Sequence, residues 1–311
     1  MSKLKALDEN LNLTDKRIIL RIDLNVPMHD GKVTDKSRIK KIIPVIKEFT
    51  KKKAKVILIS HLGRPKGKVD KKLSLKTIAP LLENLLSAKV YFSNESHGLT
   101  VIEKSKKIKS GEVLLLENIR FNKAEETNNE DFAKELSKVG DIYVNEAFSC
   151  SHRAHASVCE ITNHIDSYAG KLLTEEVNAI NMLTNKAKKP VSCIIGGSKI
   201  STKIGVLTNL VKKMQTIIIV GAMANNFIKY KGHNIGISLF EKNQDNLLKD
   251  ILKKCEANNC KLIIPEDVIV AKNYDSEIQL KPLDKIDNTD LILDIGKNTL
   301  KKIFNIIDES K

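Results

Sequence analysis

The chain has little aromatic character and no long apolar run. It contains no tryptophan, and aromatic residues make up 4% of its 311 residues. Proteins that bind single-stranded nucleic acid stack bases on aromatic side chains, so this scarcity argues against that class. No apolar run approaches the roughly 18 residues of a membrane span, and the first residues, MSKLKALDENLNL, lack the apolar core of a secretory signal. We therefore expect a cytoplasmic protein that does not enter a membrane.

The cysteines lack the spacing of a metal site or of a redox pair. There are five, with no C-x-x-C pair and no paired Cys and His spacing of the zinc type: Cys150, Cys159, Cys193, Cys255 and Cys260. His152 and His155 lie three positions apart, but no third candidate ligand is near them. We therefore expect reduced thiols and no metal bound by protein side chains alone.

Arginine is also scarce, although the chain is strongly basic. Only six of its 53 basic residues are arginine, and the formal net charge is +15. A basic protein can gain affinity for nucleic acid by releasing counterions, and it would then bind such probes less tightly as salt rises. The lysines, however, are spread along the whole chain in runs such as residues 51–53, which are typical of solvated helix faces. Nucleic acid is therefore not an expected partner.

The pattern of apolar segments predicts an α/β fold. Short apolar runs alternate with longer amphipathic ones, which is typical of βα units around a parallel sheet. The predicted strands are Arg17–Asp23, Lys55–Ser60, Val113–Leu116, Asp141–Val144, Val191–Ile195, Thr216–Val220 and Lys261–Ile264. The predicted helices are Ser37–Lys53, Leu75–Leu86, Asp131–Val139, Thr202–Lys213 and Gln244–Glu256. Pro44 falls inside the first helix, where we expect a kink or a delayed start.

Length and periodicity predict two domains with a helical connector. A chain of 311 residues exceeds what one hydrophobic core usually organises. The stretch Leu172–Leu183 has the apolar spacing of one long helix, and no Gly-rich or Ser-rich linker is present. We therefore predict two doubly wound parallel-sheet domains, residues 1–171 and 184–311, joined by a hinge helix over residues 172–183.

Polar residues follow each predicted strand of the first domain, and the scarce arginines are among them. These segments read DLNVP, SHLGRP, ENIRF and NEAFSCSHRAHAS; they contain Arg64, Arg120 and Arg153, and Arg38 opens the first helix. Ligands collect at the carboxyl ends of strands in doubly wound sheets, and guanidinium groups bind carboxylate or phosphate with two hydrogen bonds. Each arginine taken alone could equally make a surface ion pair. Together they indicate a pocket for a small, multiply anionic molecule.

Glycine turns follow two predicted strands of the second domain. Residues 194–203, IIGGSKISTK, combine a strand, a glycine turn and a helix start with two lysines, and residues 219–225, IVGAMAN, repeat this order. Glycine lets the backbone approach a ligand closely, and the amides of a helix N-terminus favour anions. The Walker A pattern does not occur. Together the two turns predict a nucleotide crevice that faces the arginine pocket.

Five segments, taken in order, resemble the phosphoglycerate kinase family over essentially the whole chain. They are RIDLNVP at 21–27, SHLGRPKG at 60–67, ENIRF at 117–121, HRAHAS at 152–157 and GGSKISTKI at 196–204. The resemblance implies a glycolytic enzyme that transfers a phosphoryl group between 1,3-bisphosphoglycerate and ADP. It also implies small-molecule substrates, Mg²⁺ bound with ATP or ADP, and a monomeric state.

The resemblance further implies roles for individual residues. The 3-phosphoglycerate site would comprise Asp23, Leu24, Asn25, Arg38, His61, Leu62, Gly63, Arg64, Arg120 and Arg153. The nucleotide site would comprise Gly196, Gly197, Ser198, Lys203, Gly221, Leu239 and Leu293. Arg38 and Lys199 would neutralise the phosphoryl group in transfer, and Lys203 would contact the nucleotide phosphates. His61 would bind substrate and not transfer a proton, because the acceptor carboxylate is already ionised at neutral pH.

The sequence departs from the family pattern in two places. Ala222 stands where the family usually has a second glycine, which is expected to narrow the nucleotide pocket slightly. Beyond residues 298–308 the family continues with a strand carrying W-N-G-P-M-G, a nucleotide-contacting glutamate and a G-G-G-D-[ST] loop, none of which occurs here. We therefore expect a C-terminally truncated chain with an incomplete second domain. The alternative to an active kinase is a non-catalytic remnant that binds 3-phosphoglycerate.

Overall fold

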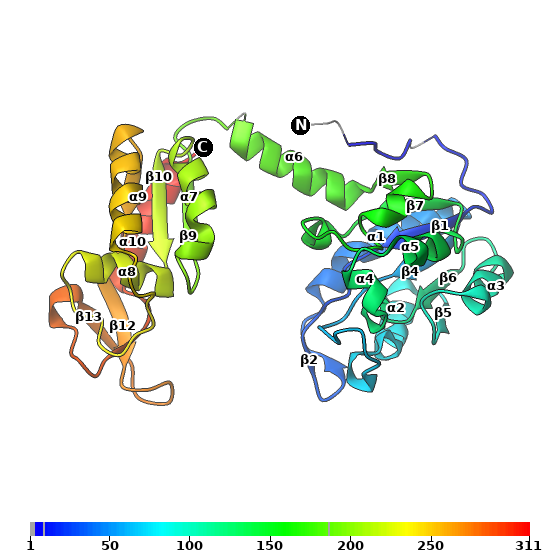
Figure 1. Ribbon diagram of the computed structural model, residues 1–311, viewed down its shortest axis with the longest axis horizontal. Coiled ribbons are helices and arrows are strands. Elements are labelled where there is room, and N and C mark those ends of the chain that lie inside the picture. Colours follow the sequence, from blue (N-terminus) through cyan, green and yellow to red (C-terminus); the bar gives the residue numbers. More distant parts are fainter. Residues whose placement is uncertain (1–3, 9, 186) are drawn as a thin grey trace. The chain divides into compact units, whose positions relative to one another are not determined.

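The computed structural model describes residues 4–8, 10–185 and 187–311. Residues 1–3, 9 and 186, which fall within the predicted domain ranges, lie outside the described residues. The chain divides into two units, Met1–Ile180 and Asn181–Lys311, and the boundary lies within helix α6 (Lys171–Asn185), which connects them in Figure 1. None of the helices in these ranges is both long and apolar enough to cross a membrane.

The N-terminal unit is built on six parallel strands, as the sequence predicts for a doubly wound domain. Their order across the sheet is β5-β6-β4-β1-β7-β8. The strands are β1 (Arg17–Arg21), β4 (Lys55–Ile59), β5 (Val90–Ser93), β6 (Val113–Leu116), β7 (Ile142–Asn145) and β8 (Ser167–Ala169). The short strands β5 and β8 were not predicted. A small antiparallel hairpin, β2 (Met28–His29) with β3 (Lys32–Val33), precedes the first long helix.

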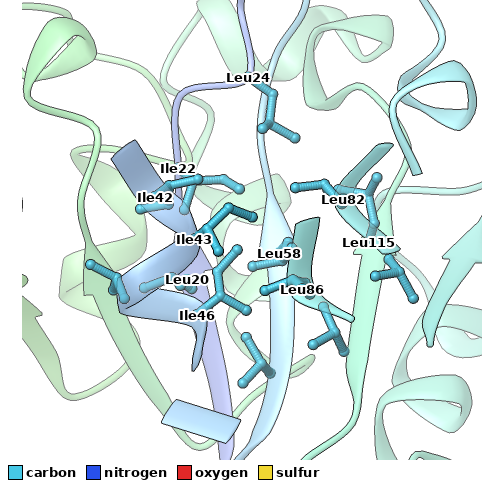
Figure 2. Close-up of a cluster of buried hydrophobic side chains, with 14 of the residues drawn as sticks. Leu20, Ile22, Leu24, Ile42, Ile43, Ile46, Leu58, Leu82, Leu86 and Leu115 are labelled. Carbon is cyan, nitrogen blue, oxygen red and sulfur yellow. The ribbon is translucent and has the colours of Figure 1, made fainter. Parts of the chain in front are cut away.

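Helices cover both faces of this sheet. Figure 2 shows apolar side chains of α1 (Ser37–Lys51) and α2 (Ala79–Leu86), among them Ile42, Ile46 and Leu82, packed beside Leu20 and Leu58 of the strands. The opposite face packs against α3 (Leu99–Lys107) and α5 (Glu130–Ser137), with α4 (Lys123–Glu126) between α3 and α5 in the chain. Burying each such Leu or Ile completely contributes about 1.5 to 3 kcal/mol relative to leaving it exposed.

Helix α1 has the amphipathic spacing that the sequence predicts. Its buried residues recur at helical intervals, including Ile39, Ile42, Ile43 and Ile46. The helix begins at Ser37, whose backbone N–H donates to Asp35 Oδ1 at 2.8 Å, and it continues through Pro44 to Lys51. A start delayed by Pro44 is therefore wrong, because the helix forms a full turn before the proline and packs on both sides of it.

The C-terminal unit contains two three-stranded sheets, of which only the parallel one was predicted. The parallel sheet has the order β11-β10-β9, and the antiparallel sheet has the order β13-β12-β14. The strands are β9 (Ser192–Gly196), β10 (Thr216–Val220), β11 (Lys261–Ile263), β12 (Asp267–Ala271), β13 (Gln279–Pro282) and β14 (Leu291–Ile295). The antiparallel sheet departs from the simple βα alternation of the sequence.

The α-helices that accompany these strands in residues 187–311 are labelled in Figure 1: α7 (Ile204–Val211), α8 (Ala222–Tyr230), α9 (Asp245–Ala257) and α10 (Lys297–Glu309). Residues of α7, α8 and α9 form the main core with β9, β10 and β12. Ile303 of α10 packs with Ile218 and Ile263 in a smaller cluster. Short 3-10 helices occur at Lys71–Leu73, Leu75–Thr77, Ile119–Phe121, Phe148–Cys150, Glu160–Asn163, Ser201–Lys203 and Leu283–Lys285.

Candidate active site

The predicted anion-binding residues lie at one edge of the N-terminal sheet. The strands are parallel, and Arg21, the last residue of β1, pairs with Ile59 of β4 and Asn145 of β7. The loops that follow β1, β4 and β7 therefore leave the sheet at the same level. This edge is where open parallel sheets bind ligands.

Asp23 connects the loop after β1 to two other segments. Its Oδ1 accepts the Asn25 backbone N–H at 2.9 Å. Its Oδ2 accepts Arg38 Nη1 at 3.0 Å and the Ser149 hydroxyl at 2.6 Å. Arg38 Nη1 also donates to the Asn25 carbonyl at 2.9 Å. The half-exposed Arg38 guanidinium is thus held beside the loop by one nitrogen, and its other nitrogens make no hydrogen bond with the residues that the structure describes.

Hydrogen bonds tie the loop after β1 to the loop after β4. The Ser60 hydroxyl accepts the Leu24 N–H at 2.9 Å and donates to the Ile22 carbonyl at 2.8 Å. The Asn25 side-chain oxygen accepts the Gly63 N–H at 2.9 Å. Gly63 has a φ of +63°, and a Cβ on it would lie 2.7 Å from Leu73 Cδ2. A side chain at this position would therefore strain the loop.

The predicted positions Leu24 and Leu62 reach the site through their backbone only. Their side chains are buried in the sheet core, with exposures of 0% and 1%. The Leu62 carbonyl accepts Asn118 Nδ2 at 2.8 Å, and Asn118 also binds the Leu73 carbonyl at 2.9 Å. These leucines position the loops, and a direct side-chain contact with a polar ligand does not fit their burial.

Arg120 is a buried cation with unused donors. Only 2% of the residue is exposed. Nη1 donates to the Gly63 carbonyl at 2.9 Å, whereas Nε and Nη2 have no hydrogen-bond partner. The Glu126 Oε1 atom lies 3.5 Å from Nε. Burial, reinforced by the charge of Arg153, lowers the pKa of Arg120. A buried guanidinium with free N–H groups provides a ready partner for an anion.

Arg153 and Arg64 differ in how they join this cluster. Arg153 is half-buried, its Nε donates to His152 Nε2 at 3.2 Å, and its charge contributes to lowering the pKa of both His61 and Arg120. Arg64 is exposed, and its side chain makes no hydrogen bond or ion pair within the described part of the chain. Arg153 therefore acts on Arg120 and His61 through its charge, whereas Arg64 is exposed to solvent.

His61 is enclosed and electrically neutral. It is 3% exposed, and its Nδ1 lies 3.3 Å from Arg21 Nη2. Burial, followed by the charges of Arg21, Arg120 and Arg153, lowers the pKa of His61 to about 2. The imidazole therefore carries no charge near neutral pH, and it can offer a hydrogen bond without adding to the positive charge of the cluster.

Three polar residues of this edge were not predicted as site residues, although they lie in the segments that follow the strands. Ser60 joins two loops, Asn118 holds the loop after β4, and Ser149 binds Asp23. Their position just after a predicted strand was the only feature of the sequence that could have identified them as site residues. Which donor meets which acceptor depends on the tertiary fold, because Ser149 and Asp23 are 126 residues apart in sequence.

In the C-terminal unit, the two predicted glycine turns lie side by side. Gly196 of β9 pairs with Val220 of β10, and the Gly197 carbonyl accepts the Met223 N–H at 2.7 Å. Gly221 has a φ of +66°, which favours glycine, and it directly precedes α8. A Cβ on Gly196 would lie 3.1 Å from Val220 Cγ2. The absence of side chains thus allows the two turns to approach each other.

A pocket lies next to these turns and contains part of the predicted nucleotide site. Gly221, Leu239 and Leu293 line it together with Asn225 and Tyr274. Leu239 and Leu293 are 61% and 36% exposed, and Asn225 Nδ2 holds the Leu239 carbonyl at 2.9 Å. Apolar walls with a few polar groups are typical of small-molecule sites. Ala222 also lines the pocket, whereas Gly196, Gly197 and Ser198 do not.

Lys199 and Lys203 both follow the first glycine turn in the sequence. Both are exposed, like Ser198, and their side chains make no hydrogen bond or ion pair with residues in the described ranges. Glu241, which was not predicted, accepts the Ser201 N–H at 3.0 Å and also binds its hydroxyl. These hydrogen bonds, with the charge of Lys199, lower the pKa of Glu241. Glu241 thus anchors the segment that carries both lysines.

Within residues 4–8, 10–185 and 187–311, no group of three or more His, Cys, Asp or Glu side chains could hold a metal ion. All five cysteines are free thiols.

The chain matches known proteins over nearly its whole length. Residues 8–311 match the family model described as phosphoglycerate kinase. Phosphoglycerate kinase of Wolbachia pipientis wMel is 44% identical over 97% of this chain and 76% of its own length. That of Orientia tsutsugamushi strain Ikeda is 45% identical over 100% and 77%.

Solved structures agree with these relatives. The phosphoglycerate kinase of Coxiella burnetii superimposes with a TM-score of 0.81 at 36% identity, covering 99% of this chain and 78% of its own. That of Pyrococcus horikoshii OT3 gives 0.83 at 29% identity, covering 97% and 78%. The α/β fold with parallel sheets agrees with this match. The chain belongs to the phosphoglycerate kinase family.

Proposed function

We propose that the N-terminal cluster binds 3-phosphoglycerate and that the C-terminal turns bind ADP or ATP in the phosphoglycerate kinase reaction. That reaction transfers a phosphoryl group reversibly between 1,3-bisphosphoglycerate with ADP and 3-phosphoglycerate with ATP. The substrate site comprises the backbone of Leu24, Leu62 and Gly63 and the side chains of Asp23, Asn25, Arg38, His61, Arg64, Arg120 and Arg153.

The observation that carries this assignment is the buried, incompletely bonded guanidinium of Arg120. Its Nε and Nη2 atoms have no hydrogen-bond partner, and Arg153 adds a second positive charge nearby. Burying a cation without a full set of acceptors is unfavourable, so the cluster gains stability when an anion supplies them. A phosphate or carboxylate with several oxygens meets this need, as 3-phosphoglycerate would.

Arg38 and Lys199 are the groups that we assign to the phosphoryl group during transfer. The acceptor in the direction of ATP consumption is a carboxylate, which needs no general base, so catalysis rests on positioning and charge neutralisation. Arg38 has guanidinium nitrogens that make no described hydrogen bond, and Lys199 is exposed beside the glycine turn. Lys203 would contact the nucleotide phosphates.

The pocket beside Gly221 is the proposed adenosine site. Leu239 and Leu293 would provide apolar walls, while Gly196, Gly197 and Ser198 would lie along the phosphates. In the described ranges, no group of three or more His, Cys, Asp or Glu side chains could hold a metal ion. We therefore propose that Mg²⁺ enters bound to the nucleotide substrate.

Helix α6 is proposed as part of the hinge that brings bound substrates together, since each substrate is assigned to a different unit. We also propose that one chain acts alone, because it carries both assigned sites. A cytoplasmic location is consistent with the free state of all five cysteines.

Calorimetric titration with 3-phosphoglycerate tests the substrate site. Arg120→Met should weaken binding by about 10- to 100-fold, because hydrogen bonds to charged groups contribute about 1.5 to 3 kcal/mol. Lys40→Met is the matched control, since it removes an exposed positive charge from α1, next to but outside the assigned site. Equal affinity in the two variants would contradict the assignment. Salt-sensitive binding of duplex DNA without binding of 3-phosphoglycerate would support the nucleic-acid alternative.

A further inference from the structure

Buried polar side chains form a chain of contacts that ends at His61 Nδ1. The Glu125 carboxylate, which is 0% exposed, accepts the Ser157 hydroxyl at 2.6 Å and the Ser157 N–H at 2.8 Å. The Ser157 hydroxyl oxygen accepts Arg21 Nε at 3.1 Å, and Arg21 Nη2 lies 3.3 Å from His61 Nδ1. This chain of contacts therefore runs from a carboxylate through a hydroxyl and a guanidinium to an imidazole.

Arg21 leaves only one protonation pattern for the imidazole. Every nitrogen of a guanidinium donates and none accepts, so a hydrogen bond between Arg21 Nη2 and His61 Nδ1 requires Nδ1 to be the acceptor. A neutral imidazole carries one proton, which must then be on Nε2. The Cys150 thiol lies 3.9 Å from the same Nδ1 atom, where it could either donate or accept. The tautomer is therefore fixed by Arg21 and not by Cys150.

Arg21 itself is held in one orientation. Nη1 donates to the Ile22 carbonyl and Nε to Ser157, while the residue is 0% exposed. Its freedom to turn away from His61 is therefore small. The cations Arg120 and Arg153 and the imidazole of His155 also act on His61, and they add to its burial in disfavouring a second proton.

The opposite nitrogen of His61 remains available. His61 Nε2 makes no hydrogen bond with the residues that the structure describes. It is also not fully buried, unlike the unpartnered Nε and Nη2 atoms of Arg120. It therefore keeps some access to solvent in a residue that is otherwise buried.

We infer that Arg21 is a positioning residue that holds His61 as its Nε2–H tautomer, so that the imidazole donates a hydrogen bond to an oxygen of bound 3-phosphoglycerate. The part that concerns substrate rests on the proposed function, whereas the tautomer follows from the contacts of Arg21 alone. A neutral donor suits this site because the arginines already supply its positive charge. The histidine adds a hydrogen bond that orients the bound substrate.

Nitrogen-15 NMR of the full chain labelled at histidine tests the tautomer directly. His61→Gln identifies the His61 signals by their loss. At neutral pH we expect the signal of a bare nitrogen for Nδ1 and that of a protonated nitrogen for Nε2, with 3-phosphoglycerate shifting Nε2 more than Nδ1. A proton on Nδ1, or on both nitrogens, would overturn the inference.

Two substitutions test the direction of the hydrogen bond. The amide nitrogen of glutamine can replace Nε2–H, whereas the shorter asparagine reaches only the position of Nδ1. His61→Gln should therefore bind 3-phosphoglycerate about tenfold more tightly than His61→Asn, which corresponds to one hydrogen bond of about 1.4 kcal/mol. Equal affinity, or tighter binding by His61→Asn, would overturn the role toward substrate. If the wild-type chain has the Nε2–H tautomer but binds no 3-phosphoglycerate, the proposed function fails and the tautomer assignment stands.

Discussion

Protonation of His61 should make the stability of the N-terminal unit unusually sensitive to mild acid. Burial, with the charges of three arginines, lowers the pKa of His61 to about 2 in the folded protein. In the unfolded chain an ordinary histidine has a pKa of about 6.5. Between these values the unfolded state binds a proton that the folded state does not, so stability falls as pH falls.

The size of this effect follows from the same two pKa values. From pH 7.5 to pH 5.0, one such histidine reduces the free energy of unfolding by about 2 kcal/mol, since each pH unit below 6.5 contributes about 1.4 kcal/mol. His61→Gln removes the titrating group. The loss of unfolding free energy over this pH range should therefore be about 2 kcal/mol smaller in His61→Gln than in the wild type. The lowered pKa of His155 contributes to the pH dependence of both proteins.

Urea unfolding at a series of pH values provides the measurement. The chain has no tryptophan, so hydrogen exchange of the peptide that contains β4 is a suitable probe of the N-terminal unit. His29→Gln is the matched control, because the His29 side chain is 80% exposed, and it should follow the wild type. Parallel pH profiles for the wild type and His61→Gln would refute the reasoning, because His61 would then titrate similarly in the folded and unfolded states.

Two substitutions outside the cluster test how the structure supports the sites. Glu146 accepts the backbone N–H groups of Lys171, Leu172 and Leu173 at 2.9, 2.8 and 3.2 Å, at the start of α6. Glu146→Ala should therefore lower the unfolding free energy of the N-terminal unit by about 2 kcal/mol, measured by hydrogen exchange in β7, and an unchanged value would contradict this role. Gly221→Ala should weaken ADP binding about fivefold in calorimetry, because alanine disfavours this positive φ by about 1 kcal/mol and so favours a free turn that differs from the one assigned to nucleotide binding, while 3-phosphoglycerate binding should not change. Loss of both affinities would instead indicate general unfolding.

The strands that carry the N-terminal site could be predicted because their apolar runs are short and clearly bounded. The prediction for Val113–Leu116 agrees with β6, and that for Lys55–Ser60 exceeds β4 by one residue. The strand β8 has only three residues, two of them half-buried, so its pattern is too short to recognise. The antiparallel strands β12 to β14 follow no βα alternation, and the sequence rule that found the other strands does not apply to them.

In the candidate site, the sequence indicated which residues to consider but not how each one is buried or hydrogen-bonded. Arg64, Arg120 and Arg153 stood out because arginine is scarce and each follows a predicted strand, and Arg38 because it opens the first helix, but their environments could not be predicted. Arg120 is enclosed with unused donors, whereas Arg64, in an equivalent sequence context, is exposed. Burial and hydrogen bonding depend on contacts between distant segments, such as that between Arg21 and Ser157, which are 136 residues apart. The roles assigned to these residues stay predictions.

The most direct test of the assigned phosphoryl-transfer site is the turnover of Arg38→Ala with ATP and 3-phosphoglycerate in a coupled assay on the 311-residue chain. The substitution should lower kcat by at least about 100-fold while the fold stays intact, because an arginine on the transferring group stabilises developing charge. Arg38→Lys should restore only part of the rate, since a lysine offers a single point charge. Lys40→Ala, on the same helix, should keep the wild-type kcat. A folded Arg38→Ala protein with wild-type kcat would contradict the assignment.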